Sequence, residues 1–159
     1  MPHIDHEQAC KILLRILPNM DTKQVEEVLF LTNKSLIGTQ RFIDLIWISE
    51  LLWSSRKDNF EFIAGCQCIG WCSHNVWILS TGGIQANIRF FLRELKKARD
   101  YAIRSFNYEP QTIYATMPIW FDDGHKLAEH FGFVIDSKTS TTVQYMGTFE
   151  VGINKGMRT

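Results

Sequence analysis

A segment in the last third of the chain, residues 112–135, constrains the fold more than any other. Its sequence is TIYATMPIWFDDGHKLAEHFGFVI. The first six residues are rich in β-branched and aromatic side chains and predict a strand, which Pro118 ends because proline donates no ladder hydrogen bond. Asp122 and Asp123 suit the start of a short helix, since their carboxylates can accept from free amides and favour the positive end of the helix dipole.

The short helix is followed by Phe131-Gly132-Phe133, which predicts a return to extended structure. Gly132 can adopt the left-handed geometry that closes a helix, and residues 133–135 are again apolar. This strand, short helix and strand, entered through Gly-Phe, resembles the C-terminal half of the GNAT acetyltransferase fold. The resemblance implies a single α+β domain with a mixed, mostly antiparallel central sheet flanked by helices on both faces.

Length, charge and the absence of apolar runs limit the other classes of protein. A chain of 159 residues with 45% apolar content is predicted to form one domain, residues 1–159. Its formal net charge is zero, so nucleic acid is an unlikely partner and an anionic membrane is not expected. No basic leader followed by an apolar core and no long apolar stretch is present, and a cytoplasmic location is predicted.

The first part of the chain predicts helices. Glu7 to Leu17 carries an apolar stripe at helical spacing and stops before Pro18, and a second helix is predicted from Asp21, so that helices occupy residues 6–35. Residues 43–53 are densely apolar, and their periodicity does not distinguish a buried strand from a helix.

The sheet is predicted to follow within residues 42–151, before a flexible tail at residues 152–159. Polar residues 54–59 predict a turn, and the alternating segment 60–69 predicts one arm of a hairpin. Residues 71–80 predict the next strand, which leads into two glycines. A last strand is predicted at residues 141–149.

The glycine turn lies between a strand and the longest predicted helix, residues 87–106. The exposed face of that helix is basic, with Arg89, Arg93, Lys96, Lys97, Arg99 and Arg104. The positive charge begins in the first turns, where it opposes the helix dipole, and a bound anion would relieve this conflict. The alternative is that Gly82 and Gly83 only make the turn and that the basic residues keep the surface soluble.

In GNAT proteins this turn and the following amides hold the pyrophosphate of acetyl-CoA. The family pattern is Gln or Arg, two residues, Gly, one residue, then Gly or Ala; here Thr81 and Ile84 occupy the first and central positions. The resemblance implies acetyl-CoA as the ligand. It places the cofactor contacts at Leu79, Thr81, Gly82, Gly83, Ile84, Gln85, Ala86 and Arg89.

Five residues are candidates for proton transfer. Many GNAT enzymes have a Tyr acid four residues before the Gly of the Gly-Phe turn, and that position here is Ala128. Tyr114 or His130 could replace it. The base for the amine could be His74 or Glu50, and His125 is a further candidate, because an imidazole titrates near neutral pH. An isolated histidine is more often structural, so both interpretations stay open.

The four cysteines are not spaced as a disulfide framework. Cys66, Cys68 and Cys72 fall within seven residues and Cys10 is far away in sequence, so reduced thiols are predicted. A zinc site formed by these three cysteines and His74 is the sharper alternative. Cys66 and Cys68 are two residues apart in a strand, which differs from the cysteine spacing of the usual structural zinc sites. We therefore favour the interpretation that the cysteines are small buried side chains, and no metal is expected.

These features lead to competing predictions of function. The first is an N-acetyltransferase that transfers an acetyl group from acetyl-CoA to a primary amine on a small molecule or a protein. The second is a catalytically inactive GNAT-fold module that binds a protein partner, as in a phage virion or host-interacting protein. The run of residues 76–80 before a basic helix is similar to GNAT-like proteins of podophages, which would place the chain in a host cytoplasm or a virion. Exposed tryptophans would favour this module.

Overall fold

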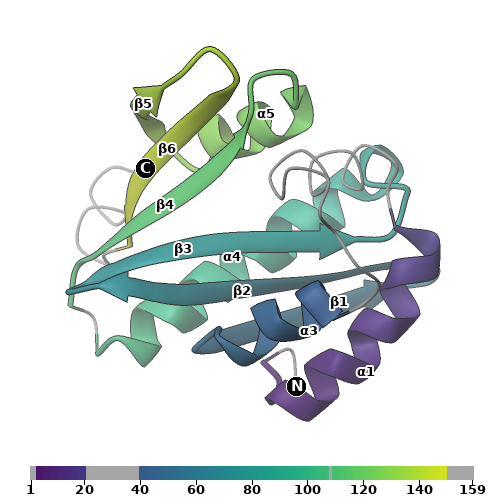
Figure 1. The fold of residues 1–159 in the computed structure, drawn as a ribbon. Helices are drawn as coiled ribbons and strands as arrows, with labels where there is room; N and C mark the ends of the chain where they lie inside the picture. Colours follow the sequence, from purple (N-terminus) through teal and green to yellow (C-terminus); the bar gives the residue numbers. More distant parts are fainter. Residues whose placement is uncertain (1–2, 21–39, 108, 150–159) are drawn as a thin grey trace.

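The protein is an α+β domain built on one six-stranded sheet (Figure 1). The computed structural model describes residues 3–20, 40–107 and 109–149. The strand order is β1-β2-β3-β4-β6-β5. β1 (Leu51–Lys57), β2 (Phe60–Gly70) and β3 (Ser73–Ser80) form an antiparallel meander. β6 (Thr142–Phe149) pairs antiparallel with both β4 (Gln111–Pro118) and β5 (Val134–Lys138) and lies between them. β3 and β4 are parallel, so the predicted mixed, mostly antiparallel sheet is confirmed.

Helices cover both faces of the sheet, as predicted (Figure 1). One face carries α1 (His6–Ile16), the short 3-10 helix η1 (Leu17–Asn19) and α3 (Gln40–Trp47). The other carries η2 (Gln85–Asn87), α4 (Ile88–Ser105) and α5 (Asp122–His130). In the part of the chain that the structure describes, no helix is long and apolar enough to cross a membrane.

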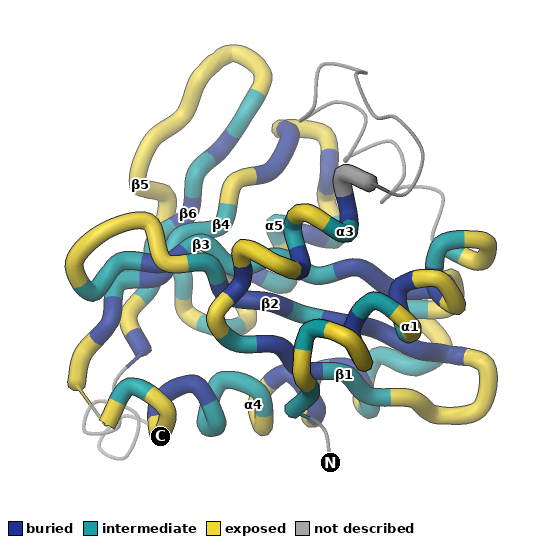
Figure 2. Tube along the Cα trace, turned by 60° about the horizontal axis from the view of Figure 1, so that its bottom comes forward, coloured by how far each residue is buried: buried dark blue, intermediate teal, exposed yellow. Residues whose placement is uncertain are grey.

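The two faces have separate cores because successive strand side chains point to opposite sides. Leu52 packs with α1 and α3, whereas the adjacent Trp53 packs against α4. The first core is mainly aliphatic and contains Ala9, Leu13, Ile16, Phe42, Ile46, Leu52, Ile63 and Leu79. The second is mainly aromatic and contains Trp53, Phe60, Phe62, Phe91 and Leu95. Figure 2 shows buried residues along α1 and the central strands, with exposed residues along β5 at the edge.

α1 begins with a capping box formed by Asp5 and Gln8. The Asp5 side chain accepts from the Gln8 N–H at 2.8 Å, and the Gln8 side chain accepts from the Asp5 N–H at 3.1 Å. This reciprocal pair satisfies two amides that the helix cannot. The α-helix ends at Ile16, ahead of Pro18, as predicted.

The ambiguous apolar segment of residues 43–53 contains both a helix and a strand. α3 extends to Trp47, and β1 starts at Leu51 after a break at Ser49. The predicted turn at residues 54–59 is wrong over most of its length, because β1 continues to Lys57 and the hairpin turns at Asp58, which has φ 55°. Polar side chains are tolerated there because β2 pairs with the backbone, as in Ser55 opposite Phe62.

The C-terminal prediction is confirmed in its order of strand, short helix and strand. Gly132 has φ 79°, the left-handed geometry expected of the residue that closes α5. One detail differs: the N-cap of α5 is Phe121, with no side-chain cap hydrogen bond, and both aspartates lie within the first turn. The predicted helix from Asp21 and the predicted tail at residues 152–159 lie outside the described residues.

A buried carboxylate joins α4 to β1 and makes stability depend on pH. The Glu94 side chain accepts hydrogen bonds from Ser55 Oγ and from Lys97 Nζ, the latter at 2.9 Å. Burial disfavours its charge, but the hydrogen bonds from Ser55 and Lys97, with the charges of Lys97 and Arg93, lower the pKa of Glu94 overall. A carboxyl whose pKa is lowered by folding stabilises the protein above its unfolded-state pKa of about 4.3 and loses that contribution in acid.

We therefore expect Glu94→Gln to reduce the dependence of the free energy of unfolding on pH in the acidic range. Wild type should lose stability as the pH falls from about 5 through the lowered pKa of Glu94, and the variant should lose less over the same range. Urea unfolding at a series of pH values would measure this. The exposed Glu129→Gln is a suitable control; equal slopes for wild type and Glu94→Gln would contradict the assignment.

Candidate active site between the diverging strands

β3 and β4 separate soon after they begin, and this opening is the main irregularity of the sheet. Within the described residues they pair from Ser73 to Asn75 on β3 and from Thr112 to Tyr114 on β4. Residues 76–80 of β3 and 115–118 of β4 are not paired with each other. Figure 1 shows the two strands meeting at their first residues and diverging toward their ends.

The opening is part of a cavity of about 890 Å³. Its walls come from both helical layers, including Leu45 of α3, Ile48 directly after α3, Ile88 and Leu92 of α4, and Leu127 of α5. The strand residues that line it include Asn75, Val76 and Trp77 of β3 and Ala115, Thr116 and Met117 of β4. Because residues of both faces contribute, the cavity extends through the sheet at the point where β3 and β4 diverge. The volume lies within the range of small-molecule sites.

One wall of the cavity is the indole of Trp77, which lies flat against a glycine. A Cβ added to Gly65 would lie 2.3 Å from the Trp77 ring, so only glycine fits opposite this ring. The Trp77 Nε1–H donates to Ser49 Oγ at 2.8 Å, and Ser49 Oγ donates to the Leu45 carbonyl at 2.8 Å. The side chain is thereby held against α3.

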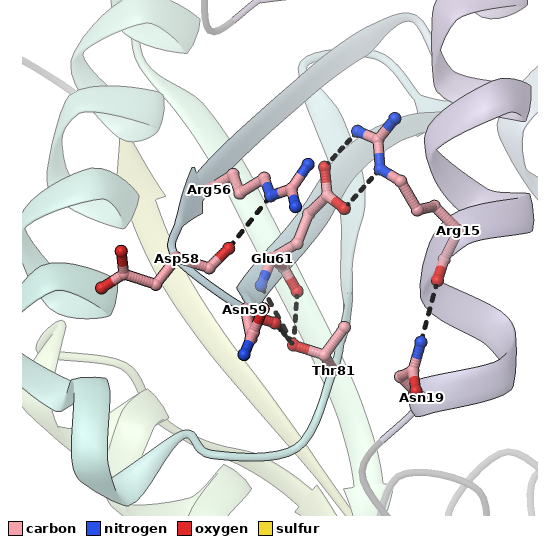
Figure 3. Close-up of polar contacts among 7 residues, drawn as sticks. All are labelled: Arg15, Asn19, Arg56, Asp58, Asn59, Glu61 and Thr81. Atoms are coloured by element: carbon pink, nitrogen blue, oxygen red, sulfur yellow. Dashed lines mark hydrogen bonds and ion pairs between the residues drawn. The ribbon is translucent and has the colours of Figure 1, made fainter.

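The beginning of the glycine turn is attached to the rest of the protein by its own hydrogen bonds (Figure 3). The Thr81 N–H donates to Glu61 O at 2.9 Å, and Thr81 Oγ1 accepts from the Glu61 N–H at 3.0 Å. The Glu61 carboxylate in turn forms a bidentate ion pair with Arg15 of α1, at 2.5 and 2.9 Å. The Gly82 N–H donates to Asn19 O at 3.0 Å. The amides of Thr81 and Gly82 are therefore occupied.

The amides that follow are the ones available for a ligand. Among the described residues, the first amide of the following helical run with a backbone acceptor is that of Asn87, which donates to Gly83 O and Ile84 O at 3.1 Å each. A helix leaves its first N–H groups without intrahelical partners, so residues 83–86 present donors at the positive end of η2 and α4. Gly83 has φ 98°, and no acidic residue lies in the first turn of either helix.

The strand alternation determines which β3 amides point toward the opening. The Thr81 N–H is directed to β2, so the amides of Leu79 and Trp77, at the two-residue repeat, are directed to β2 as well. The amides of Val76, Ile78 and Ser80 are therefore directed to the side of β4. The Thr112 N–H donating to Cys72 O at 2.8 Å on that side agrees with this alternation.

The structure divides the predicted cofactor residues into two groups. Leu79, Ile84 and Gln85 line the cavity. Thr81, Gly82, Gly83, Ala86 and Arg89 are not among its lining residues, although they belong to the same turn and helix start. Gln85 also connects the turn to α5, since its Nε2 donates to Asp123 Oδ1 at 3.4 Å.

Four of the five candidates for proton transfer, Glu50, His74, Tyr114 and His125, lie outside the lining of the cavity. The structure brings His74 and Glu50 together, with Nδ1 and Oε1 3.7 Å apart, at the end of the sheet where β3 and β4 are paired. Tyr114 is the last residue of β4 that pairs with β3. His130, at the end of α5, does line the cavity.

Both ring nitrogens of His125 form hydrogen bonds within the protein, which indicates a structural role. Its Nε2 donates to the Ile119 carbonyl at 2.8 Å and to the Pro118 carbonyl at 3.1 Å, because a carbonyl can only accept. In the neutral ring, Nδ1 then accepts from the Tyr145 hydroxyl at 2.8 Å. The imidazole thus connects α5 to the end of β4 and to β6.

Sequence reasoning missed Asn75 and Thr116, polar residues that line the cavity close to where the strands separate. Neither belongs to a recognisable motif. The only signal is position, because Asn75 is the last residue of β3 that pairs with β4, and a sequence does not reveal where a strand pair ends.

The four cysteines form no disulfide. All four are free, and Cys66 is buried in β2. Burial, together with the negative charge of Glu50 and Cys68, raises the pKa of Cys66 to about 12, so this thiol is protonated at neutral pH. Cys66 therefore fits the favoured interpretation of a small buried side chain.

The described fold is that of the GNAT acetyltransferases. The N-acetyltransferase PseH of Campylobacter jejuni, solved in complex with acetyl coenzyme A, aligns with a TM-score of 0.50 at 13% identity over 80% of this chain and 91% of that chain. An acetyltransferase of the GNAT family from Streptococcus pneumoniae aligns with a TM-score of 0.52 at 13% identity, covering 74% and 79% of the two chains. No protein-family model and no curated protein sequence matches the chain.

Proposed function

We propose that the protein is an N-acetyltransferase that transfers the acetyl group of acetyl-CoA to a primary amine. The observation that carries this proposal is the divergence of β3 and β4 around a cavity of about 890 Å³, with a helix start facing its end. Support comes from the fold, which the chain shares with an acetyltransferase solved with acetyl coenzyme A.

The chemistry of the cavity fits the two halves of this substrate. Apolar residues such as Val76, Met117 and Leu127 line it and suit a long, flexible acyl-carrying chain. The amides of residues 83–86 and the exposed Arg89 suit a pyrophosphate, because helix starts bind anions. The turn departs from the family pattern at its central position, because the side chain of Ile84 lines the cavity where the family has glycine.

The reaction would proceed by direct attack of the amine nitrogen on the thioester carbonyl carbon. A C–N bond forms, the C–S bond breaks, the amine nitrogen loses a proton, and the thiolate takes up a proton as CoA leaves. His130 lines the cavity and is the titratable side chain that we propose for proton transfer.

Calorimetric titration with acetyl-CoA and with CoA tests the proposal. We expect micromolar binding of both, followed by release of free thiol when acetyl-CoA is incubated with a panel of amines that includes an amino sugar, a polyamine and a peptide with a free N-terminus. No heat at millimolar acetyl-CoA would overturn the proposal. The binding module would then be favoured, because Trp71 is 93% exposed and Trp47 is 55% exposed.

A further inference from the structure

Three potential metal ligands meet at the end of the sheet where β3 and β4 are paired. Cys68 of β2 and His74 of β3 are directly opposite one another, and Glu50 directly precedes β1. The Glu50 N–H donates to Cys66 O at 2.9 Å, which fixes the backbone of Glu50 beside β2. One side-chain oxygen, sulfur or nitrogen of each of the three residues lies within 4.8 Å of the others.

The ring of His74 is held in one orientation. The residue is 3% exposed, and its ring lies 4.5 Å from the ring of Phe106. Nε2 lies 2.7 Å from Gln111 Oε1. The Gln111 Nε2 group donates to the Glu109 carbonyl at 3.4 Å, which leaves the amide oxygen facing His74. The His74 Nε2 therefore carries a proton and donates it.

The other nitrogen of this ring, Nδ1, faces one carboxylate. Nδ1 is buried and has no hydrogen bond among the described residues. Its charged neighbour is Glu50 Oε1, at 3.7 Å. In the neutral tautomer, Nδ1 thus directs a lone pair at a carboxylate, which is unfavourable unless a positive charge lies between them. Histidine ligands of metals commonly have this arrangement, with one ring N–H donated to a carbonyl oxygen and the other nitrogen left for the ion.

A metal ion accounts for the cluster more completely than a proton does. A proton on Nδ1 would pair His74 with Glu50 but would not involve Cys68, whose Sγ donates to the Gly70 carbonyl at 3.3 Å. Imidazole, thiolate and carboxylate together are the ligand types of zinc. Bonds of about 2.0–2.3 Å require donor atoms roughly 3.3–3.8 Å apart, so the cluster must contract by about 1 Å at its widest. The side chains of Glu50 and Cys68 are exposed and can move, whereas His74 is fixed.

We propose that Glu50, Cys68 and His74 bind a divalent transition-metal ion of the zinc class, with the remaining coordination position open to water or an external ligand. The irregular pairing of β2 and β3 between Cys68 and Gly70 favours such a site, because bulges redirect side chains near functional positions. Cys66 and Cys72 are not members of the cluster. None of the three ligands lines the cavity, so the proposal does not depend on acetyl transfer.

Cobalt titration of the full chain, stripped with a chelator and kept reduced, tests the site. We expect wild type to bind one equivalent of Co²⁺ with a sulfur-to-metal charge-transfer band, and Zn²⁺ to displace it. Cys68→Ser should abolish the band, and Glu50→Gln should weaken Co²⁺ binding at least about tenfold, since even outer partners of a metal ligand contribute that much. Both residues are exposed, so both variants should fold.

Cys72→Ser is the matched control, because it removes a neighbouring thiol that is outside the cluster. It should retain the band and the affinity. Zn²⁺ should also raise the melting temperature of wild type and of Cys72→Ser but not of Cys68→Ser. The proposal is overturned if wild type binds no Co²⁺ at submillimolar concentration, or if Cys68→Ser retains the band of wild type.

Discussion

Replacing Phe62 with alanine is expected to lower the free energy of unfolding by about 3–5 kcal/mol, the usual cost of removing a fully buried phenyl ring. Phe62 has no exposed surface and lies in β2, in the middle of the meander. Its ring meets that of Phe91 edge-to-face at 5.0 Å and that of Phe60 at 6.3 Å. The loss combines the apolar area, the aromatic pairs and the cavity that remains.

Phe90→Ala provides the comparison, because it is the same substitution at a half-buried position of α4. The Phe90 ring touches Phe60 at 6.2 Å and lies under Arg93, and its removal should cost less than about 2 kcal/mol. Urea unfolding followed by tryptophan fluorescence measures both. Equal losses for the two variants would mean that the aromatic core between the sheet and α4 is not packed as described.

A second large effect is expected on acetyl-CoA binding from charge reversal at the start of α4. Arg89→Glu should raise the Kd at least about tenfold, because it exchanges an attractive charge for a repulsive one beside the phosphate donors. Gly83→Asp should abolish detectable binding, since it adds a carboxylate to the turn and a side chain to a residue with φ 98°. Calorimetric titration with acetyl-CoA measures the change.

Two variants separate this effect from general charge and from backbone strain. Arg104→Glu makes the same change of charge in the last turn of the same helix and should leave the Kd close to that of wild type. Gly83→Ala adds strain without charge and should fall between wild type and Gly83→Asp. If Arg104→Glu weakens acetyl-CoA as much as Arg89→Glu, the helix start is not the phosphate site.

The sequence predicted those parts of the fold that local chemistry determines. Gly132 and the residues around it specify a helix end whatever the rest of the chain does, and the apolar stripe of α4 has a strong period. The boundary between α3 and β1 was not predictable. Residues 43–53 are apolar throughout, and the change at Ser49 depends on its contacts with Trp77 and with His6, both distant in sequence.

The candidate site was predicted in outline only. The sequence predicts the glycine turn, but it also predicts that Thr81 contacts the ligand. No local feature of the sequence reveals the hydrogen bonds between Thr81 and Glu61. His74 and Glu50 were identified as titratable residues with a possible function, and the structure adds Cys68 to them through the register of β2 and β3. Such groupings arise from strand pairing, which a single sequence does not specify.

The position of Ser49 links the interior of the protein to its first helix. Its hydroxyl holds the Trp77 indole, while its carbonyl lies 2.9 Å from His6 Nε2, whose ring stacks on Trp47. A ligand that displaces the Trp77 indole would therefore also disturb the contacts of Ser49 with His6 of α1. Through the contacts of Ser49, a ligand bound in the opening would therefore affect the position of α1.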